Sequence, residues 1–395
     1  FASDPAFQAT VLLLQERIPR TSALYLPPPA ASDDRTAPAG ADVPVRSFSG
    51  PDTPAPEVQL LSNGRYHVVV SAAGGGYTRW KDLAVTRWRE DATADNWGTF
   101  CYLRDVTTGA YWSTAYQPTL QAADRFEAVF SEARAEFRSL LHQIESHVEI
   151  AVSPEDDVEL RRVRLTNSGR ARRTIEATSY AEVALAATAA EALHPAFSNL
   201  FAQTEIVRDQ RAILCARRPR SRGESSPWMF HLLAAHGASA GNALSYETDR
   251  LRFLGRGRTP ADPIAMREPG PLSGTAGAVL DPIVAIRGRF VLEPDESITL
   301  DLVSGVADTR AACLGLVGKY QDRRLANRVF ALASTHAQVA LRQLNASEAD
   351  AQLFCQLAGS IIYANPSLRA DPAILGRNRR GQSGLWGYSI SGDLP

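Results

Sequence analysis

The chain has 395 residues, of which 45% are hydrophobic, and a formal net charge of −1 at pH 7. This length allows two or three domains with a large buried core, and the balanced charge excludes the strongly basic surface typical of nucleic-acid-binding proteins. Lys81 and Lys319 are the only lysines among 42 basic residues, so we interpret the arginine content as compositional bias.

Cysteine spacing and apolar runs indicate the compartment. The four cysteines form no CxxC pair and have no histidine at metal-ligand spacing, which predicts buried free thiols and no metal site; they are Cys101, Cys215, Cys313 and Cys355. No apolar run approaches the ~18 residues of a membrane-spanning helix, and no signal peptide is recognised. We therefore expect a cytoplasmic protein or the cytoplasmic portion of an inner-membrane protein.

Residues 1–57 show little apolar periodicity and many prolines, including three in a row at 27–29. This composition predicts an N-terminal segment followed by a linker that polyproline geometry stiffens. The chain starts at Phe1 without Met and stops at Pro395 within a Gly-rich stretch. We expect it to be a fragment of a longer protein.

Residues 58–305 have the two-residue periodicity of β-strands. The Asn63-Gly64 pair predicts a hairpin before the strand at 65–71, and apolar residues alternate over 174–185 and 298–302. The apolar phase slips between Leu160 and Val163, which predicts a β-bulge there. Many such runs between Asn, Gly, Asp and Pro turns predict a large antiparallel β-sandwich.

After residue 305 the periodicity becomes helical, with expected helices at 307–319 and 323–342. The apolar stripe of the second helix is Leu325, Val329, Leu332, His336 and Val339. We interpret His336 as a core or interface histidine. Ser347 and Asp350 form a capping box that opens a third helix, whose apolar face is Leu353, Leu357 and Ile361. We predict a helical linker over 306–345 and a new helical domain over 346–395.

Two segments combine aromatic and charged residues in a way that suits carbohydrate. Residues 63–118 contain Trp80, Trp88, Trp97 and Trp112 among Arg/Asp pairs and three consecutive glycines at 74–76. Aromatic rings stack on the apolar faces of sugars, and charged groups bind hydroxyls, although the same residues also suit a sheet core with cross-strand ion pairs. In the Gly-rich end, Asp393 follows Trp386 and Tyr388; it suits hydroxyl recognition or, equally, a turn or helix cap.

Several motif blocks resemble glycoside hydrolase family 94, formerly glycosyltransferase family 36. The blocks are the stretch from NGRYHVVV to FCYLRD at 63–105, HPAFSNLF at 194–201, LSGTAGAVLDPIVAIR at 272–287 and RGQSGLWGYSISGDLP at 380–395. Within this family the chain is most similar to the C-terminal region of cyclic β-1,2-glucan synthases and to β-1,2-oligoglucan phosphorylases. The resemblance implies a fold that is mainly β with C-terminal α: an antiparallel β-supersandwich (58–305), a helical linker and the truncated start of an (α/α)6 barrel.

The resemblance also implies the chemistry, which is inverting phosphorolysis. One carboxylic acid protonates the glycosidic oxygen while inorganic phosphate attacks the anomeric carbon, so no cofactor or second carboxylate is required. The family motif that carries this acid is absent, since Asp95-Asn96-Trp97 echoes it only within the sandwich. We therefore expect the acid beyond Pro395 and an inactive fragment. The implied partners are a β-glucan or oligosaccharide, phosphate and a second subunit in a homodimer.

For substrate binding the resemblance implies a donor-sugar loop that ends at Asp393, with Trp386 and Tyr388 beside it. Ser391-Gly392 stands where some relatives place an arginine. Tyr77 and Trp80, from a sandwich loop at 74–80, are further candidates for contact with sugar. We predict a fragment of a glycosyltransferase or phosphorylase acting on β-1,2-glucan; the alternative is a non-catalytic β-glucan-binding or dimerisation module. A third reading, a mutarotase-like enzyme, depends on His142, His147, Glu145 and Glu149.

Overall fold

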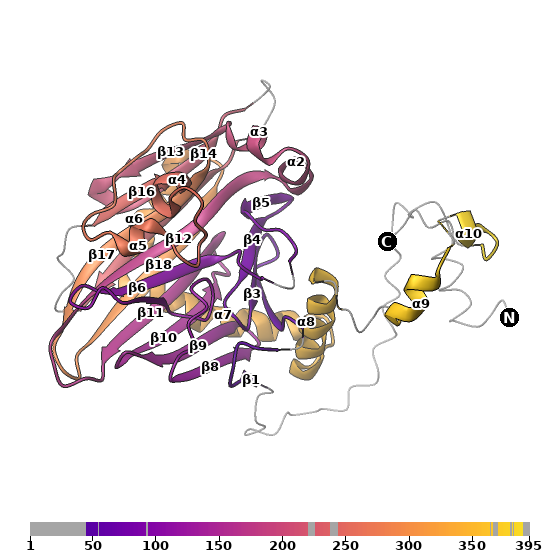
Figure 1. The fold of residues 1–395 in the computed structure, drawn as a ribbon, viewed down its shortest axis with the longest axis horizontal. Helices are drawn as coiled ribbons and strands as arrows, with labels where there is room; N and C mark the ends of the chain where they lie inside the picture. Colours follow the sequence, from indigo (N-terminus) through magenta and orange to yellow (C-terminus); the bar gives the residue numbers. More distant parts are fainter. Residues whose placement is uncertain are drawn as a thin grey trace. The chain divides into compact units, whose positions relative to one another are not determined.

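The structure is a computed structural model, and it describes residues 45–53, 55–91, 94–219, 226–237, 244–363, 365, 370–379, 381 and 383–389. The chain divides into two compact units, one of Val43–Ala364 and one of Phe1–Asp42 with Asn365–Pro395. Most of the predicted N-terminal linker therefore lies outside the described residues. The first unit contains two large β-sheets that pack face to face (Figure 1).

In the described part each sheet has nine strands, all joined in antiparallel pairs. The first sheet has, from edge to edge, β1 (Arg46–Phe48), β8 (Arg125–Ser131), β9 (Arg134–Leu141), β10 (Ile144–Val152), β11 (Val158–Asn167), β18 (Ser297–Ala307), β15 (Trp228–His236), β14 (Ala212–Arg217) and β13 (Ala202–Val207). The second has β16 (Ser245–Asp249), β17 (Pro282–Leu292), β12 (Arg173–Ala187), β5 (Leu83–Thr86), β4 (Gly76–Trp80), β3 (Tyr66–Ser71) and β2 (Val58–Ser62); β6 (Thr99–Asp105) also pairs with β12, and β7 (Tyr111–Ser113) with β6. This architecture confirms the predicted antiparallel sandwich.

The helices within the sandwich are short, and the longest helices follow it. The short ones are α2 (Thr188–Leu193), α3 (Pro195–Asn199), the 3-10 turn η1 (Arg208–Gln210), α4 (Arg250–Leu254) and α5 (Ile264–Arg267). The later ones are α6 (Arg310–Gln321), α7 (Arg323–Gln343), α8 (Glu348–Ile362), α9 (Pro372–Arg377) and α10 (Ser383–Trp386). Among the described residues, no helix combines the length and apolar character needed to cross a membrane.

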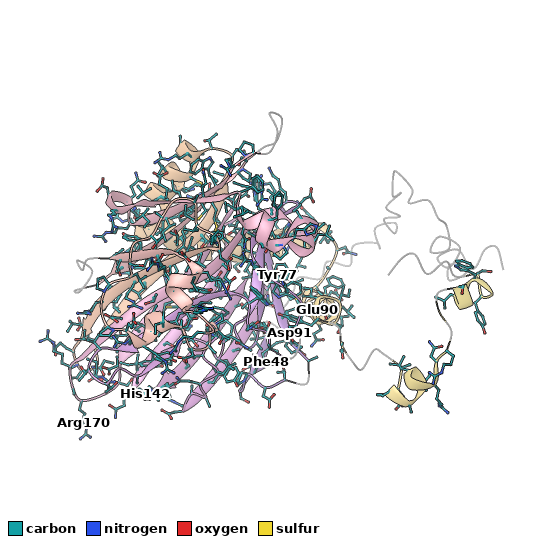
Figure 2. The ribbon with its side chains drawn as sticks, turned by 45° about the horizontal axis from the view of Figure 1, so that its top comes forward. Phe48, Tyr77, Glu90, Asp91, His142 and Arg170 are labelled. Atoms are coloured by element: carbon teal, nitrogen blue, oxygen red, sulfur yellow. The ribbon has the colours of Figure 1, made fainter. Side chains whose placement is uncertain are left out.

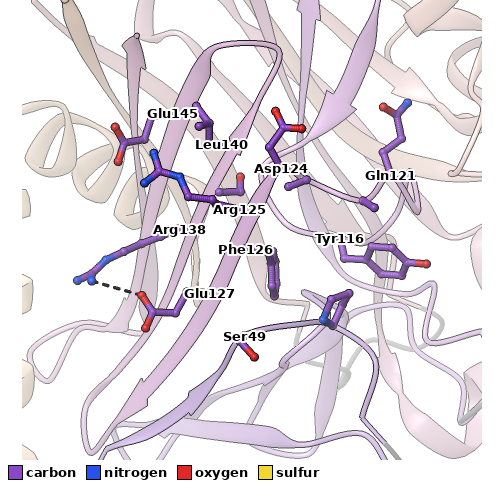
Figure 3. A pocket seen from close by; sticks show the side chains of 14 residues that line it. Ser49, Tyr116, Gln121, Asp124, Arg125, Phe126, Glu127, Arg138, Leu140 and Glu145 are labelled. Atoms are coloured by element: carbon purple, nitrogen blue, oxygen red, sulfur yellow. Dashed lines mark ion pairs between the residues drawn. The ribbon is translucent and has the colours of Figure 1, made fainter.

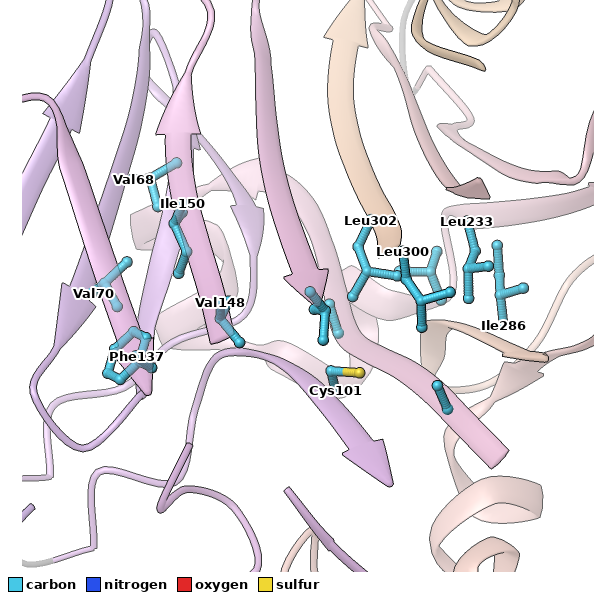
Figure 4. Packing of buried hydrophobic residues seen from close by; sticks show 14 of the residues in the cluster. Val68, Val70, Cys101, Phe137, Val148, Ile150, Leu233, Ile286, Leu300 and Leu302 are labelled. Carbon is cyan, nitrogen blue, oxygen red and sulfur yellow. The ribbon is translucent and has the colours of Figure 1, made fainter. Parts of the chain in front are cut away.

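The main core lies between the inner faces of the two sheets. Val148 and Ile150 of β10 lie opposite Val68 and Val70 of β3, and Leu300 and Leu302 extend the same layer along β18 (Figure 4). The alternation of apolar residues along these strands places them all on one face. Because each fully buried aliphatic side chain contributes about 1.5–3 kcal/mol, this layer is the main source of stability.

The predicted bulge between Leu160 and Val163 is wrong. β11 keeps one continuous register with both β10 and β18. Leu160 instead points to the outer face, where it joins a second core under α6 and α7, whereas Val163 points to the inner core. The apparent slip arises because helices cover part of the outer face, so β11 carries apolar residues on both sides.

The predicted helices occur at the expected places, but the buried face of α7 differs from the predicted apolar stripe. The buried residues of α7 are Ala326, Val329, Phe330 and Ala333, while His336 is exposed and Val339 is 46% exposed. The interpretation of His336 as a core residue is therefore wrong, and its alternative, an interface residue, stays a prediction. Small alanines let the first half of α7 approach the sheet closely, and its second half carries no comparable buried row.

The third helix begins as predicted. Ser347 and Asp350 form a reciprocal capping box at the start of α8. Near this end Arg46 donates to the Gln352 side chain at 2.7 Å and to the Val58 carbonyl at 2.7 Å. These bonds attach α8 to β1 and β2, and its predicted apolar face remains largely exposed at Leu353, Leu357 and Ile361.

The glycines at 74–76 form a tightly packed turn between β3 and β4. Gly74 and Gly76 have positive φ of 95° and 136°. A Cβ at Gly75 would lie 2.6 Å from the Asp95 carboxylate oxygens, and one at Gly76 would lie 1.9 Å from the Val69 carbonyl oxygen. The turn therefore packs closely against Asp95 and the β3 backbone.

We predict that Gly76→Ala destabilises the sandwich by about 3 kcal/mol, because the new methyl group would collide with the β3 backbone at a positive φ. Urea unfolding followed by tryptophan fluorescence measures this loss. Gly315→Ala is the matched control: Gly315 lies in α6 with nothing within 4 Å of an added Cβ, so alanine there should stabilise by about 0.5–1 kcal/mol. Equal stability of the two variants would contradict the assigned contact.

Candidate functional site

A buried carboxylate joins three segments that are far apart in the sequence. Asp95 accepts hydrogen bonds from the hydroxyl groups of Ser71, at the end of β3, and of Tyr363, just after α8; the Tyr363 bond is 2.5 Å long. The Ser71 hydroxyl in turn accepts the backbone N–H of Gly75 at 3.0 Å. This joint links the glycine turn, the segment before β6 and the end of α8.

Aromatic rings form one side of this joint. The ring of Tyr77 lies 4.9 Å from that of Trp88, and the Trp88 ring lies 5.7 Å from that of Tyr363 in an edge-to-face arrangement. Beyond Trp88, the chain continues to Glu90 and Asp91, whose side chains are exposed (Figure 2). The aromatic–carboxylate combination predicted for a sugar site therefore occurs here, but its carboxylate is enclosed.

Burial determines the protonation states of Asp95 and Tyr363. Burial raises the pKa of Asp95 to about 6, although the hydrogen bonds from Ser71 and Tyr363 act in the opposite direction. Burial and the nearby Asp95 raise the pKa of Tyr363 far above its ordinary range, so its hydroxyl remains a donor. Asp95 is only 8% exposed, and each of its carboxylate oxygens already accepts a hydrogen bond from the protein. The geometry fits a structural joint better than a catalytic acid.

The predicted substrate residues lie in different environments. Trp80 is 5% exposed; its indole N–H donates to Asp157 at 2.7 Å, and the Lys81 ammonium lies 3.9 Å from the ring centroid. Tyr77 belongs to the aromatic cluster described above. Trp386 and Tyr388 belong to the second compact unit and are 64% and 66% exposed. Asp393 lies outside the described residues. A substrate role for all five stays a prediction.

A second buried joint was missed by sequence reasoning. The Arg87 guanidinium donates to Glu182 at 2.7 Å, to Glu191 at 2.8 Å and to Asp281 at 2.7 Å. It also donates to Asn199 at 2.8 Å. Burial alone would lower the pKa of Arg87, but the three carboxylates raise it overall, led by Glu182. The guanidinium therefore stays charged.

The sequence did contain a signal for the Arg87 joint. Arg87, Asn199 and Asp281 belong to three of the motif blocks that carried the family resemblance. Those blocks converge on one ion-pair network between β5, β12, α2 and α3. At Arg87 the motifs therefore mark a structural ion-pair network.

Three of the residues proposed for a mutarotase-like site, Glu145, His147 and Glu149, lie in a row on the outer face of β10, and two of them already have partners. His147 lies 3.0 Å from Glu136, and Arg134 donates to Glu149 at 2.6 Å. The hydrogen bond with His147 lowers the pKa of Glu136. His142 lies in the β9–β10 turn with its ring 5.1 Å from that of Trp112. Because His147 and Glu149 are engaged in ion pairs, this arrangement does not favour epimerase chemistry. Within the described ranges no cluster of three or more His, Cys, Asp or Glu could hold a metal ion.

The buried Asp95 carboxylate predicts a pH-dependent stability. Folding raises its pKa from 3.8 to about 6, so its contribution to stability is complete below pH 4 and is lost as the pH rises through about 6. Asp95→Asn keeps the shape and remains neutral. The free energy of unfolding of this variant relative to wild type should therefore rise by about 3 kcal/mol between pH 4 and pH 8.

Urea unfolding of both proteins across this pH range tests the prediction. Asp82→Asn, at an exposed turn, is the control and should differ from wild type by a constant amount. A pH-independent difference for Asp95→Asn would show that Asp95 is ionised in the folded state throughout.

Comparison with known proteins identifies the family. The model of the glycosyl hydrolase 94 supersandwich domain matches residues 41–323. The cyclic beta-(1,2)-glucan synthase NdvB of Rhizobium meliloti (strain 1021) is 36% identical over 400 residues, which cover 100% of this chain and 14% of that protein. The N,N'-diacetylchitobiose phosphorylase of Vibrio furnissii is 28% identical over 291 residues, which cover 72% of this chain and 35% of that enzyme.

Among solved structures, a putative kojibiose phosphorylase from the human microbiome matches with a TM-score of 0.41 and 9% identity, covering 81% of this chain and 41% of that one. The chain spans 14% and 35% of the length of the two curated relatives named above. On the match of its residues 41–323, this chain belongs to glycosyl hydrolase family 94 and carries the supersandwich domain of that family.

Proposed function

We propose that this chain is part of an enzyme that transfers glucosyl units of β-1,2-glucan. The observation that carries the proposal is the similarity to a cyclic β-1,2-glucan synthase along the entire chain, at 36% identity. Phosphorylases among the other relatives support inorganic phosphate as the acceptor. The reaction is then either phosphorolysis of the glucan or adjustment of its chain length during synthesis of the cyclic product.

The proposed chemistry needs one proton donor and no cofactor. An acid protonates the glycosidic oxygen, and a phosphate oxygen attacks the anomeric carbon from the opposite face of the sugar, which inverts the configuration. Asp95, the carboxylate in the aromatic cluster, is enclosed by Ser71 and Tyr363. We therefore assign the sandwich a supporting role, and we retain Asp393 with Trp386 and Tyr388 as the candidates for holding the donor glucose.

A second function, for the chain by itself, is that of a non-catalytic β-glucan-binding or dimerisation module. The family match favours it, because residues 41–323 correspond to the supersandwich domain. We propose a homodimer for the same chain, which sedimentation would measure. We further propose a cytoplasmic location, since the four cysteines are buried free thiols.

The 395-residue chain, mixed with β-1,2-glucan and inorganic phosphate, should bind the glucan and release no glucose 1-phosphate. Calorimetry measures the binding, and an enzyme-coupled assay measures glucose 1-phosphate. Asp393→Ala should weaken binding about tenfold if it accepts sugar hydroxyls.

Two results would overturn parts of this proposal. Release of glucose 1-phosphate by the chain itself would contradict the supporting role assigned to it. Binding of chitobiose or cello-oligosaccharides in place of β-1,2-glucan would contradict the proposed linkage. Asp371→Ala, whose side chain caps α9, is the control for a general effect of removing a carboxylate from the same segment.

A further inference from the structure

A groove of about 610 Å³ lies at the edge of the first sheet, beside the start of β8. β1 pairs with β8 only over 128–130, so in the described part the first residues of β8 have no strand partner on that side. Ser49, just after β1, and the segment 116–124 form the opposite wall (Figure 3). The volume lies within the range of ~300–1,000 Å³ that is usual for small-molecule sites.

Two aromatic side chains line this groove. Tyr116 comes from the segment after β7 and Phe126 from β8, and both rings border the open space between the walls (Figure 3). Both side chains are half-buried: Phe126 packs against the main core, and its ring lies 6.4 Å from that of Phe137. A fixed ring with one open side can stack on the C–H face of a pyranose.

Polar side chains at the rim have unused hydrogen-bonding capacity. On the outer face of the first sheet, Glu127 pairs with Arg138 at 3.6 Å. Further along the strands, Arg134 pairs with Glu149, and His147 pairs with Glu136. In contrast, the side chains of Asp124, Arg125 and Glu145 make no ion pair or hydrogen bond to any other residue that the structure describes. Their donors and acceptors are available to a ligand.

The charges of the groove indicate what kind of ligand fits. Asp124, Glu127 and Glu145 are acidic, and Arg125 and Arg138 are basic. Interspersed charges of both signs provide no net field for an anion such as phosphate or nucleic acid. Carboxylates and guanidinium groups do bind neutral hydroxyls, as acceptors and donors respectively. Aromatic faces and mixed charges therefore favour a neutral oligosaccharide.

We propose that this groove is a saccharide-binding site that holds a segment of a neutral oligosaccharide across the open edge of β8, with one sugar ring stacked on Tyr116 or Phe126 and the hydroxyls of a neighbouring sugar bound by Arg125 and Glu145 on the outer face of the sheet. The identity of the ligand as β-1,2-glucan rests on the proposed function. The groove would keep a long glucan on the protein between rounds of transfer, so it should increase affinity for long chains more than for short ones.

The test measures binding of linear β-1,2-linked gluco-oligosaccharides and of cello-oligosaccharides to the 395-residue chain by calorimetry. Tyr116→Ala and Arg125→Ala should each weaken, about tenfold, the binding of whichever oligosaccharide series the wild-type chain binds. Tyr116→Phe should retain most of the affinity, since the stacking face remains. Arg170→Ala is the matched control, because Arg170 is also exposed and lies at the β11–β12 turn, outside the groove. Arg125 is exposed, so its variant should fold normally, which unfolding curves would verify.

The outcomes separate this inference from the proposed function. If β-1,2-linked chains bind but neither groove variant weakens them, the groove is not the site and the inference fails, while the proposed function stands. If only cello-oligosaccharides bind and both variants weaken them, the groove is a saccharide site and the β-1,2 linkage fails. If neither series binds at millimolar concentration, the inference is overturned, and glucosyl transfer by the longer enzyme is then tested separately.

Discussion

The structure depends on the face-to-face packing of its two sheets. The inner faces of β3, β10, β12 and β18 contribute many of the apolar side chains that leave water. Polar groups within this layer are matched between the sheets: His231 on β15 lies 2.8 Å from both Ser304 on β18 and Ser179 on β12. Burial lowers the pKa of His231 to about 3, so it stays neutral and bridges the sheets without the cost of burying a charge.

The buried charged groups Arg87 and Asp95, near the ends of the sheets, contribute less to stability than this packing. Arg87 and Asp95 sit where short helices and loops cross the sheet ends, and each binds partners from several segments. Such groups are costly to bury unless all their partners are in place, so they contribute mainly by fixing loop positions. Three resemblance motifs meet at Arg87, so at this point the motifs describe how the domain is built.

This organisation affects how function is assigned. Aromatic residues beside carboxylates suggested a sugar site, yet Trp80 and Asp95 are both buried, with 5% and 8% of their surface exposed. Side chains without a partner among the described residues instead surround the groove near the start of β8: Arg125 comes from β8 and Glu145 from β10, and Tyr116 borders the same groove. A residue can bind a ligand only with surface and hydrogen bonds that folding has not already used, and sequence composition does not reveal which residues retain them.

Local patterns in the sequence determined the element types: alternation defined the strands, the Asn63-Gly64 pair the β2–β3 hairpin, and Ser347 with Asp350 the start of α8. These features depend on neighbours within a few residues, and so they can be read without the fold. Tertiary structure decided that Leu160 and Val163 face different cores and that His336 is exposed. Those outcomes depend on whether α6 and α7 cover a strand more than 140 residues away in the chain, and no local pattern records that burial.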